Sequence, residues 1–206
     1  MRRQQHAYGK VHAPDRVGLV LFHHRGFVHS RPAAPHDARL LHRSQQLHGM
    51  VSGYGTNITD GLRKGLDLHR RTPPGVLRRI WLLSDGKPNV ETERLHGEVR
   101  RARSERVNVN TIGFGDEYDG RLLRGISRGT HNGKFVPVGS LRALTNALVS
   151  SNARKMQRNR HHRSETTILV IDISGSMVNP MGRRTKIQVV EEAILHLLNY
   201  KQRMFS

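Results

Sequence analysis

The stretch of residues 168–177 constrains the fold of this chain more than any other. An apolar run, Ile168–Ile171, stops abruptly at Asp172 and is followed by two serines, Ser174 and Ser176. A short apolar run without polar alternation is typical of a parallel strand that is buried on both faces. The acidic and hydroxyl side chains then leave the strand at its carboxyl end, which is where open α/β sheets place their ligand sites.

The side chains after this strand indicate a hard metal ion. One carboxylate and two hydroxyls offer oxygen donors, which suit Mg²⁺ or Mn²⁺ better than zinc. Three donors are too few for an octahedral ion. The remaining ligands must therefore come from other loops, from water or from a partner.

Apolar runs and helical periodicities alternate along the rest of the chain. Strands are predicted at 17–22, 76–84, 107–115 and, weakly, 134–138, and helices at 36–48, 58–68, 91–104, 119–127, 140–150 and 186–200. A tight turn at Arg25-Gly26 joins the first strand to a short one at Phe27-Val28, which favours a hairpin with an antiparallel edge strand. The fold class predicted is α/β, with a doubly wound, mainly parallel sheet and helices on both faces.

Length and composition narrow the classes of protein. The 206 residues are enough for one α/β domain, and the absence of cysteine excludes disulfides and thiolate metal sites. No apolar run approaches the length of about 20 residues that spans a bilayer, and no apolar signal segment follows the amino terminus, so a cytoplasmic protein without a membrane partner is the default expectation. The formal charge of +19 predicts attraction to polyanions such as nucleic acid.

Oxygen donors recur in two more loops of the predicted sheet. Thr56 lies in a glycine-rich loop before a helix, and Asp85 follows the strand at 76–84. Both are expected at the same edge of the sheet as Asp172. Together, Asp-Ile-Ser-Gly-Ser at 172–176, Gly-Thr-Asn at 55–57 and Ser-Asp-Gly at 84–86 resemble the metal-ion-dependent adhesion site of von Willebrand factor type A domains.

This resemblance implies a role for each donor. The hydroxyls of Ser174, Ser176 and Thr56 would contact the metal, and Asp172 and Asp85 would hold it directly or through water. A vacant position on Mg²⁺ or Mn²⁺ would then take a carboxylate from a partner protein. The resemblance therefore implies metal-bridged binding and not turnover.

Two asparagines near these loops, Asn57 and Asn89, are candidates for supporting the metal ligands. Formation of the turns themselves is the alternative role. A hydrolase would need a general base or a second metal near the first. Asp116 and Glu117 are the only near candidates, so no enzymatic activity is expected.

The order of the elements departs from that family. There the strand with the two serines and its helix come first, whereas here they come last, which predicts a circularly permuted, Rossmann-like domain. Residues 1–150 would run from the second strand to the last helix, 151–165 would be a basic linker, and 166–206 would supply the first strand and helix. Two alternatives stay open: pieces of two domains in a tandem array, or exchange of the last strand and helix with a second copy.

Two functions are therefore compared. The first is a metal-dependent protein-binding module, and the helix start at Arg184–Ile187 is similar to intracellular chelatase subunits, which implies an AAA+ ATPase as a partner. The alternative is a nucleic-acid-binding protein that acts through its basic surface. A chelator should abolish the first activity, whereas salt should weaken the second steeply.

Overall fold

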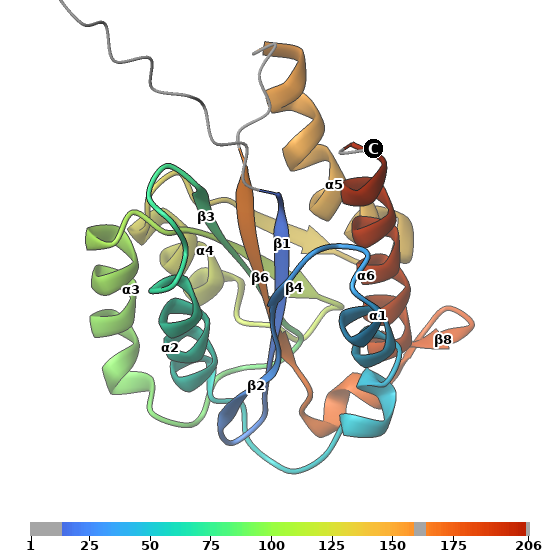
Figure 1. Cartoon of the computed structure of the whole chain (residues 1–206). Helices are drawn as coiled ribbons and strands as arrows, with labels where there is room; N and C mark the ends of the chain where they lie inside the picture. Colours follow the sequence, from blue (N-terminus) through green and yellow to red (C-terminus); the bar gives the residue numbers. More distant parts are fainter. Residues whose placement is uncertain (1–13, 159–163, 205–206) are drawn as a thin grey trace, which may run out of the picture.

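Six strands form one sheet at the centre of the molecule. The computed structural model describes residues 14–158 and 164–204. The strands lie in the order β2-β1-β6-β3-β4-β5, and all neighbours are parallel except β2 and β1 (Figure 1). The predicted α/β class with a mainly parallel sheet is confirmed.

The strand β6 (Glu165–Asp172), late in the sequence, lies at the centre of this sheet. It pairs in parallel with β1 (Arg16–Phe22) on one side and β3 (Leu77–Ser84) on the other. Every residue of β6 is buried. The apolar run around Ile168–Ile171 is thus a doubly buried parallel strand, as its composition predicts.

The strands at the two edges of the sheet differ in length from the predictions. The hairpin after β1 is confirmed, but β2 runs over Gly26–Ala33, well beyond the two residues predicted. Exposed and polar residues alternate irregularly along β2, and bulges interrupt its register with β1, so the sequence pattern is weak there. On the other side, β4 (Asn108–Phe114) and the short β5 (Phe135–Val138) complete the sheet.

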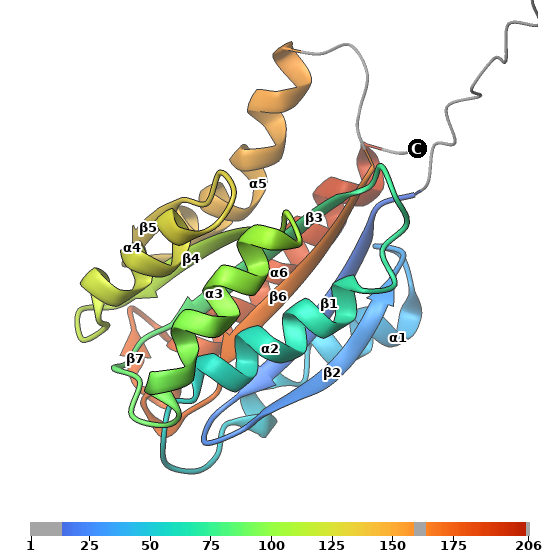
Figure 2. The same ribbon diagram turned by 90° about the vertical axis from the view of Figure 1, so that its left-hand side faces the viewer.

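Helices cover both faces of the sheet (Figure 2). One face carries α1 (Ala38–Ser44), α5 (Leu141–Arg158) and α6 (Lys186–Arg203), and the other carries α2 (Ile58–His69), α3 (Leu95–Ser104) and α4 (Gly120–Gly129). Alternate side chains of each strand point to opposite faces, so Leu169 joins the core under α6 and Val170 the core under α2. The domain is therefore a three-layer sandwich with two apolar cores.

Short elements connect this framework. They are the 3₁₀ turns η1 (Leu47–Met50), η2 (Thr92–Arg94) and η3 (Gly175–Val178), and a small hairpin of β7 (Pro180–Met181) with β8 (Arg184–Thr185). The hairpin leads directly into α6, whose start is fixed by a reciprocal capping box between Thr185 and Gln188. This cap sets the position of the first residue of α6, Lys186.

The predicted linker at 151–165 is wrong in its extent. Helix α5 continues through Arg158, and β6 already begins at Glu165. Residues 151–158 contain no glycine or proline, and alanine, arginine, lysine, methionine and glutamine all favour helix, so a basic composition does not make them coil. The remainder of the predicted linker, 159–163, lies outside the described residues, as does most of the predicted entry segment at 1–13.

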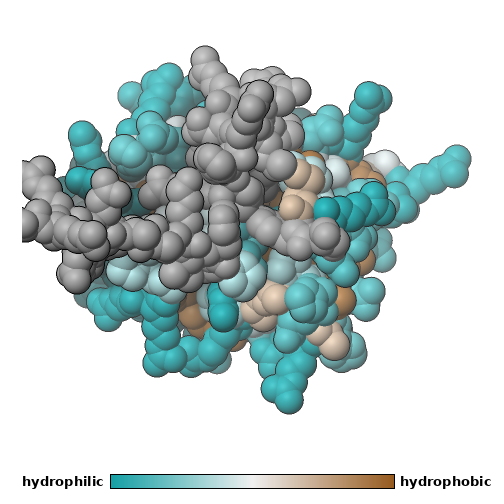
Figure 3. Space-filling view, turned by 45° about the horizontal axis from the view of Figure 1, so that its top comes forward, coloured by the Kyte–Doolittle hydropathy of each residue, from teal (hydrophilic) through white to brown (hydrophobic). Residues whose placement is uncertain are grey.

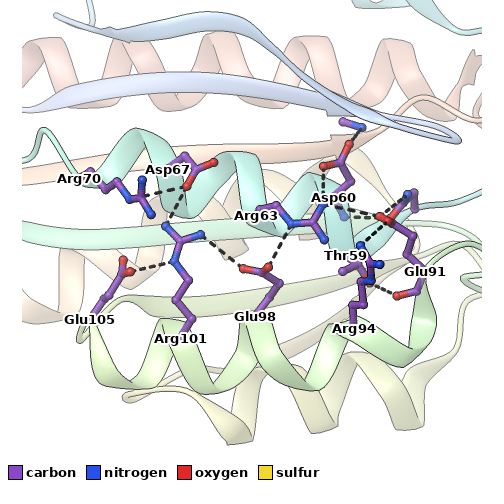
Figure 4. A network of polar contacts seen from close by, with 12 residues as sticks. Thr59, Asp60, Arg63, Asp67, Arg70, Glu91, Arg94, Glu98, Arg101 and Glu105 are labelled. Atoms are coloured by element: carbon purple, nitrogen blue, oxygen red, sulfur yellow. Dashed lines mark hydrogen bonds and ion pairs between the residues drawn. The ribbon is translucent and has the colours of Figure 1, made fainter.

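Helix α2 lies unusually close to the sheet. A Cβ atom added at Gly61 would lie 2.8 Å from the Phe22 ring, and one at Gly65 would lie 2.9 Å from Val170. The outer side of α2 is joined to α3 by a network of ion pairs (Figure 4). Its members are Asp60, Arg63, Asp67, Arg70, Glu91, Arg94, Glu98, Arg101 and Glu105.

A second ionic group is buried at the amino ends of the parallel strands. The Lys201 ammonium lies 2.7 Å from Asp15 and 3.4 Å from Glu165, and Glu165 also pairs with Arg79 at 3.0 Å. All four side chains are almost fully buried. The group joins the end of α6 to the starts of β1, β3 and β6, so it links these four elements at the amino ends of the parallel strands.

Taken over the described parts of the chain, no helix is both long and apolar enough to cross a membrane.

Candidate metal centre

Three parallel strands end side by side at the lower edge of the sheet in Figure 1. Phe22 at the end of β1 is level with Asp172 at the end of β6, and Ser84 ends β3 next to them. After β6 the chain passes to α6 on one face, and after β3 it passes to α3 on the other. Adjacent strands that diverge in this way open a crevice at their carboxyl ends, which is the usual ligand position in open α/β sheets.

The Asp172 carboxylate lies at the end of the central strand, below the surface of this edge. It is fully buried, and it accepts hydrogen bonds from the Ser174 backbone N–H at 2.9 Å and from the Ser84 hydroxyl at 2.8 Å. Burial raises the pKa of Asp172 to about 6, helped by the negative charge of Asp85 and opposed by the hydrogen bonds from Ser174 and Ser84. A cation beside this carboxylate would favour its charged form.

The two serines connect Asp172 to Asp85. The hydroxyl oxygens of Ser174 and Ser176 lie 3.3 Å apart, and the Ser176 hydroxyl donates to Asp85 Oδ1 at 2.8 Å. Adjacent ligand oxygens on an octahedral Mg²⁺ ion lie about 2.9 Å apart, given metal–oxygen distances of about 2.0–2.1 Å. The spacing of these oxygen atoms therefore fits a magnesium-sized ion.

Thr56 reaches the same place from the loop before α2. Its backbone N–H donates to the Asn89 side chain at 2.9 Å, and the Asn89 N–H donates to the Thr56 carbonyl at 3.3 Å. A Cβ atom at Gly86 would lie 3.6 Å from the Thr56 hydroxyl, so this hydroxyl faces the loop that carries Asp85. The structure thus places Thr56 beside the predicted donors, with Asn89 holding its loop.

Asn57 has a different role. Its side-chain oxygen accepts from the Asp60 backbone N–H and caps α2, and its amide group donates to the His24 carbonyl and to Glu91. These are the turn-forming and capping contacts that were the alternative prediction for this residue.

Lys186 is a member of this site that the sequence analysis missed. Its ammonium lies 2.7 Å from Asp85 Oδ2, and the lysine side chain is only 8% exposed. Lys186 is the first residue of α6, where the helix dipole disfavours a positive charge. A lysine in the first turn of the helix after the serine loop was the available signal for a nearby buried carboxylate.

The site contains few acidic ligands. Among the described residues, no group of three or more histidines, aspartates and glutamates is placed to hold a metal ion. A cation at this edge would therefore depend on the three hydroxyls as well as on Asp172 and Asp85. The residues fit a weakly held oxygen-coordinated ion better than a tightly bound one.

Two hollows beside the candidate metal centre differ in the charge of the residues that line them. A hollow of about 570 Å³ beside the end of β1 is lined by His23, Arg25 and Lys64, with one carboxylate, Asp60, among the other lining residues. Another of about 520 Å³ beyond Gly86 is lined by Asp116 and Glu117, together with Lys87 and Tyr118. An acidic partner would be attracted to the first hollow and repelled from much of the second.

Comparison with known families identifies this fold. The family model described as "von Willebrand factor type A domain" matches residues 10–150. The chain belongs to the von Willebrand factor type A domain family. Such domains are generally protein-interaction modules, and many depend on a metal. The matched residues of the von Willebrand factor type A domain include Thr56 and Asp85 and stop before β6.

Other comparisons add little to this assignment. A crystal structure of an uncharacterized membrane spanning protein from Vibrio fischeri shares 21% sequence identity, covering 68% of this chain and 76% of that chain, with a TM-score of 0.34. That likeness is too low to carry an argument. No curated protein matches the chain.

Proposed function

We propose that this von Willebrand factor type A domain is a metal-dependent protein-binding module. Mg²⁺ or Mn²⁺ would be held by Ser174, Ser176, Thr56, Asp172 and Asp85, and a carboxylate of a partner protein would complete its coordination. The observation that carries the proposal is the continuous row of oxygen atoms from Ser174 through Ser176 to Asp85, with spacings that suit an octahedral ion.

The ligand set explains why a partner would be needed. Two carboxylates balance the charge of a divalent ion. The other three ligands are hydroxyl oxygens, which are neutral and bind a metal weakly. A bound ion would therefore still attract a further anion. When bound, the ion would supply a positive charge at the centre of a polar rim. The chain's own residues would orient the partner, with His23, Arg25 and Lys64 on the favourable side.

Lys186 supports a reversible site. In the absence of a divalent ion its ammonium neutralises Asp85, so this buried carboxylate is not left unpaired. A divalent ion would have to compete with an ammonium that is covalently attached to the chain. We therefore infer that the ion binds weakly and that the partner carboxylate adds much of the stability of the assembled complex.

The permutation is part of the same proposal. Asp172, Ser174 and Ser176 come from the end of the chain, whereas Thr56 and Asp85 come from the part that the family model matches. The central position of β6 between β1 and β3 supports completion of the fold within one chain. An AAA+ ATPase is the class of partner that the sequence similarity to chelatase subunits favours.

Selection from a peptide library tests this function. The immobilised domain is exposed to random peptides displayed on phage in millimolar Mg²⁺, and bound phage are eluted with EDTA. The expected result is enrichment of peptides with an invariant aspartate or glutamate, whose replacement by asparagine or glutamine abolishes binding. Enriched peptides that lack acidic residues, or phage that EDTA does not release, would contradict the proposal.

A further inference from the structure

A basic pocket lies at the end of the sheet opposite the candidate metal centre. It has a volume of about 390 Å³. Its lining comes from the starts of β1 and β6, the end of β2 and the segment between α2 and β3, and consists of Pro14, Arg16, Arg31, Pro32, Leu68, Arg71, Thr72, Pro73, Val76 and Thr166. Three arginines from three separate elements thus face one concave surface.

The three arginines form no ion pair within the part of the chain that the structure describes. Within residues 14–158 and 164–204, no carboxylate lies within ion-pair distance of Arg16, Arg31 or Arg71. Asp15 and Glu165, which are next in sequence to the pocket residues Arg16 and Thr166, are buried and paired with Lys201. Three like charges gathered on one surface repel one another, so a bound anion would relieve a cost that the free protein carries.

The distribution of acidic residues strengthens this imbalance. Five of the carboxylates lie in the network between α2 and α3, where they neutralise arginines on the outer side of the molecule (Figure 4). Figure 3 shows the molecule with the top of Figure 1 turned forward, and the side chains that are drawn in colour in this view are mostly hydrophilic. The carboxyl end of α2 adds a partial negative charge near Arg71, but it amounts to about half a unit against three full positive charges.

Two further basic stretches of the sequence are attached at this pocket. Residues 1–13 join the chain at Pro14, which lines the pocket, and contain Arg2, Arg3 and Lys10 but no acidic residue. Residues 159–163 contain Arg160 and Arg163 and join at Ser164, whose carbonyl accepts from the N–H of Leu77, the neighbour of a pocket residue.

We propose that this pocket binds the phosphodiester backbone of a nucleic acid. The planar guanidinium group forms paired hydrogen bonds to phosphate oxygens, and arginine is favoured where phosphate is recognised. A ligand with regularly repeated phosphates matches three guanidinium groups from three separate elements better than a single small anion does.

The proposal is tested with the full chain and a fluorescein-labelled 20-nucleotide oligouridylate, with DNA of the same length as a second probe. Binding is measured by fluorescence anisotropy at several salt concentrations in the presence of EDTA. The pocket variant carries Arg16→Gln, Arg31→Gln and Arg71→Gln. The matched control carries Arg39→Gln, Arg103→Gln and Arg128→Gln, which remove the same charge from exposed positions elsewhere.

The pocket variant should lose affinity much more than the control. Loss of three phosphate contacts is expected to weaken binding about a hundredfold in 0.1 M salt and to reduce the slope of log Kd against log salt by about 2. Circular dichroism of both variants verifies that they remain folded.

Two results would overturn the proposal. If the control variant loses as much affinity as the pocket variant, the charge acts diffusely and no site exists. If a polyglutamate peptide of 20 residues binds as tightly as the oligonucleotides and with the same dependence on the pocket, the ligand is an acidic protein. EDTA is present throughout, so the result is independent of the candidate metal centre.

Discussion

The Lys186 ammonium and the Asp85 carboxylate form a buried ion pair at 2.7 Å, within the set of residues proposed to hold a divalent cation. The same carboxylate accepts a hydrogen bond from Ser176 through its other oxygen. If the proposed function holds, Asp85 would have two alternative positive partners, the Lys186 ammonium and a divalent ion from solution. This relationship makes the lysine the natural competitor of the metal.

Replacement of Lys186 by methionine should expose that competition. Without divalent ions, Lys186→Met is expected to lose about 3–5 kcal/mol of unfolding free energy, because Asp85 would be left buried without a partner. Millimolar Mg²⁺ should restore much more stability to this variant than to the wild type. Urea denaturation in EDTA and in Mg²⁺ measures both effects.

The control for this experiment is Lys134→Met, at an exposed lysine of similar length. Its stability should change by less than about 0.5 kcal/mol and should not depend on Mg²⁺. If Mg²⁺ stabilises Lys186→Met no more than the wild type, the lysine does not compete with a cation at this site.

Asn89 is expected to act on the metal through Thr56. Its side chain holds the Thr56 backbone N–H, so Asn89→Ala should lower the affinity for Mn²⁺ by about tenfold to a hundredfold without removing a ligand. Thr56→Val should lower it at least as much, whereas Thr56→Ser keeps the hydroxyl and should retain most of it. Equal affinities of the valine and serine variants would show that the Thr56 hydroxyl does not bind the ion.

His69 should make the stability of the domain depend on pH between about 4 and 6.5. Its ring is fully buried, with Nδ1 at 3.1 Å from the Thr72 hydroxyl and Nε2 at 3.1 Å from the Arg79 carbonyl, and burial lowers its pKa to about 4. In this pH range the unfolded chain binds a proton that the folded chain does not. The stability is therefore complete above pH 6.5 and falls as the pH drops toward 4, by about 3 kcal/mol.

Denaturation of wild type and His69→Gln at a series of pH values measures this effect. The glutamine side chain can still donate to the Arg79 carbonyl but does not titrate. Its curve should lack the decline that His69 causes between pH 6.5 and 4. Identical curves for the two proteins would exclude His69 as the source.

Lys201 should contribute strongly to the stability of the closed domain. It is the cation shared by Asp15 and Glu165, and its loss would leave buried carboxylates with reduced compensation. Lys201→Met is expected to cost about 3–5 kcal/mol, whereas Arg203→Met, at an exposed position two residues later, should cost less than about 0.5 kcal/mol. Similar losses in both variants would show that the buried pairs are not the cause.

The charge state of Glu165 follows from the same group. Burial alone would raise the pKa of Glu165, but the Lys201 and Arg79 cations and the Thr167 hydroxyl together lower it to about 2. A lowered carboxyl pKa stabilises the native state above about pH 4.5, and this contribution is lost as the pH falls toward 2. Acid unfolding of the domain should therefore begin at the amino ends of β1, β3 and β6, where Glu165 pairs with Lys201 and Arg79.

The central strand and the donors after it were predictable because their signals are local. An apolar run that stops at Asp172 specifies a buried strand with a polar exit, and strand β6 does end at Asp172, although it begins at Glu165, three residues before the apolar run. That Thr56 and Asp85 lie near it also followed, since carboxyl ends of parallel strands meet at one edge. The clearest example is the hydrogen bond from the Ser176 hydroxyl to Asp85, because these two residues lie far apart in the sequence.

The features that sequence reasoning missed depend on tertiary contacts. A lysine at the start of α6 indicates that a carboxylate lies nearby, but nothing local identifies Asp85 as that partner, because the pair is made by tertiary contact. The continuation of α5 to Arg158 was missed because a cluster of charges was taken as a sign of a linker, although helix propensity there is high. The pairing of Lys201 with Asp15 joins opposite ends of the chain and has no local signature.

The most direct test of the central claim is a titration with Mn²⁺ followed by electron paramagnetic resonance, on the wild type, Asp172→Asn and Thr56→Val. One ion should bind per wild-type chain, and both variants should lose it, because the late strand and the early loop each supply a ligand. Mg²⁺ should displace the bound Mn²⁺, since both ions suit the same oxygen donors. The absence of binding at millimolar Mn²⁺, or binding that both variants retain, would contradict a metal centre assembled from these residues.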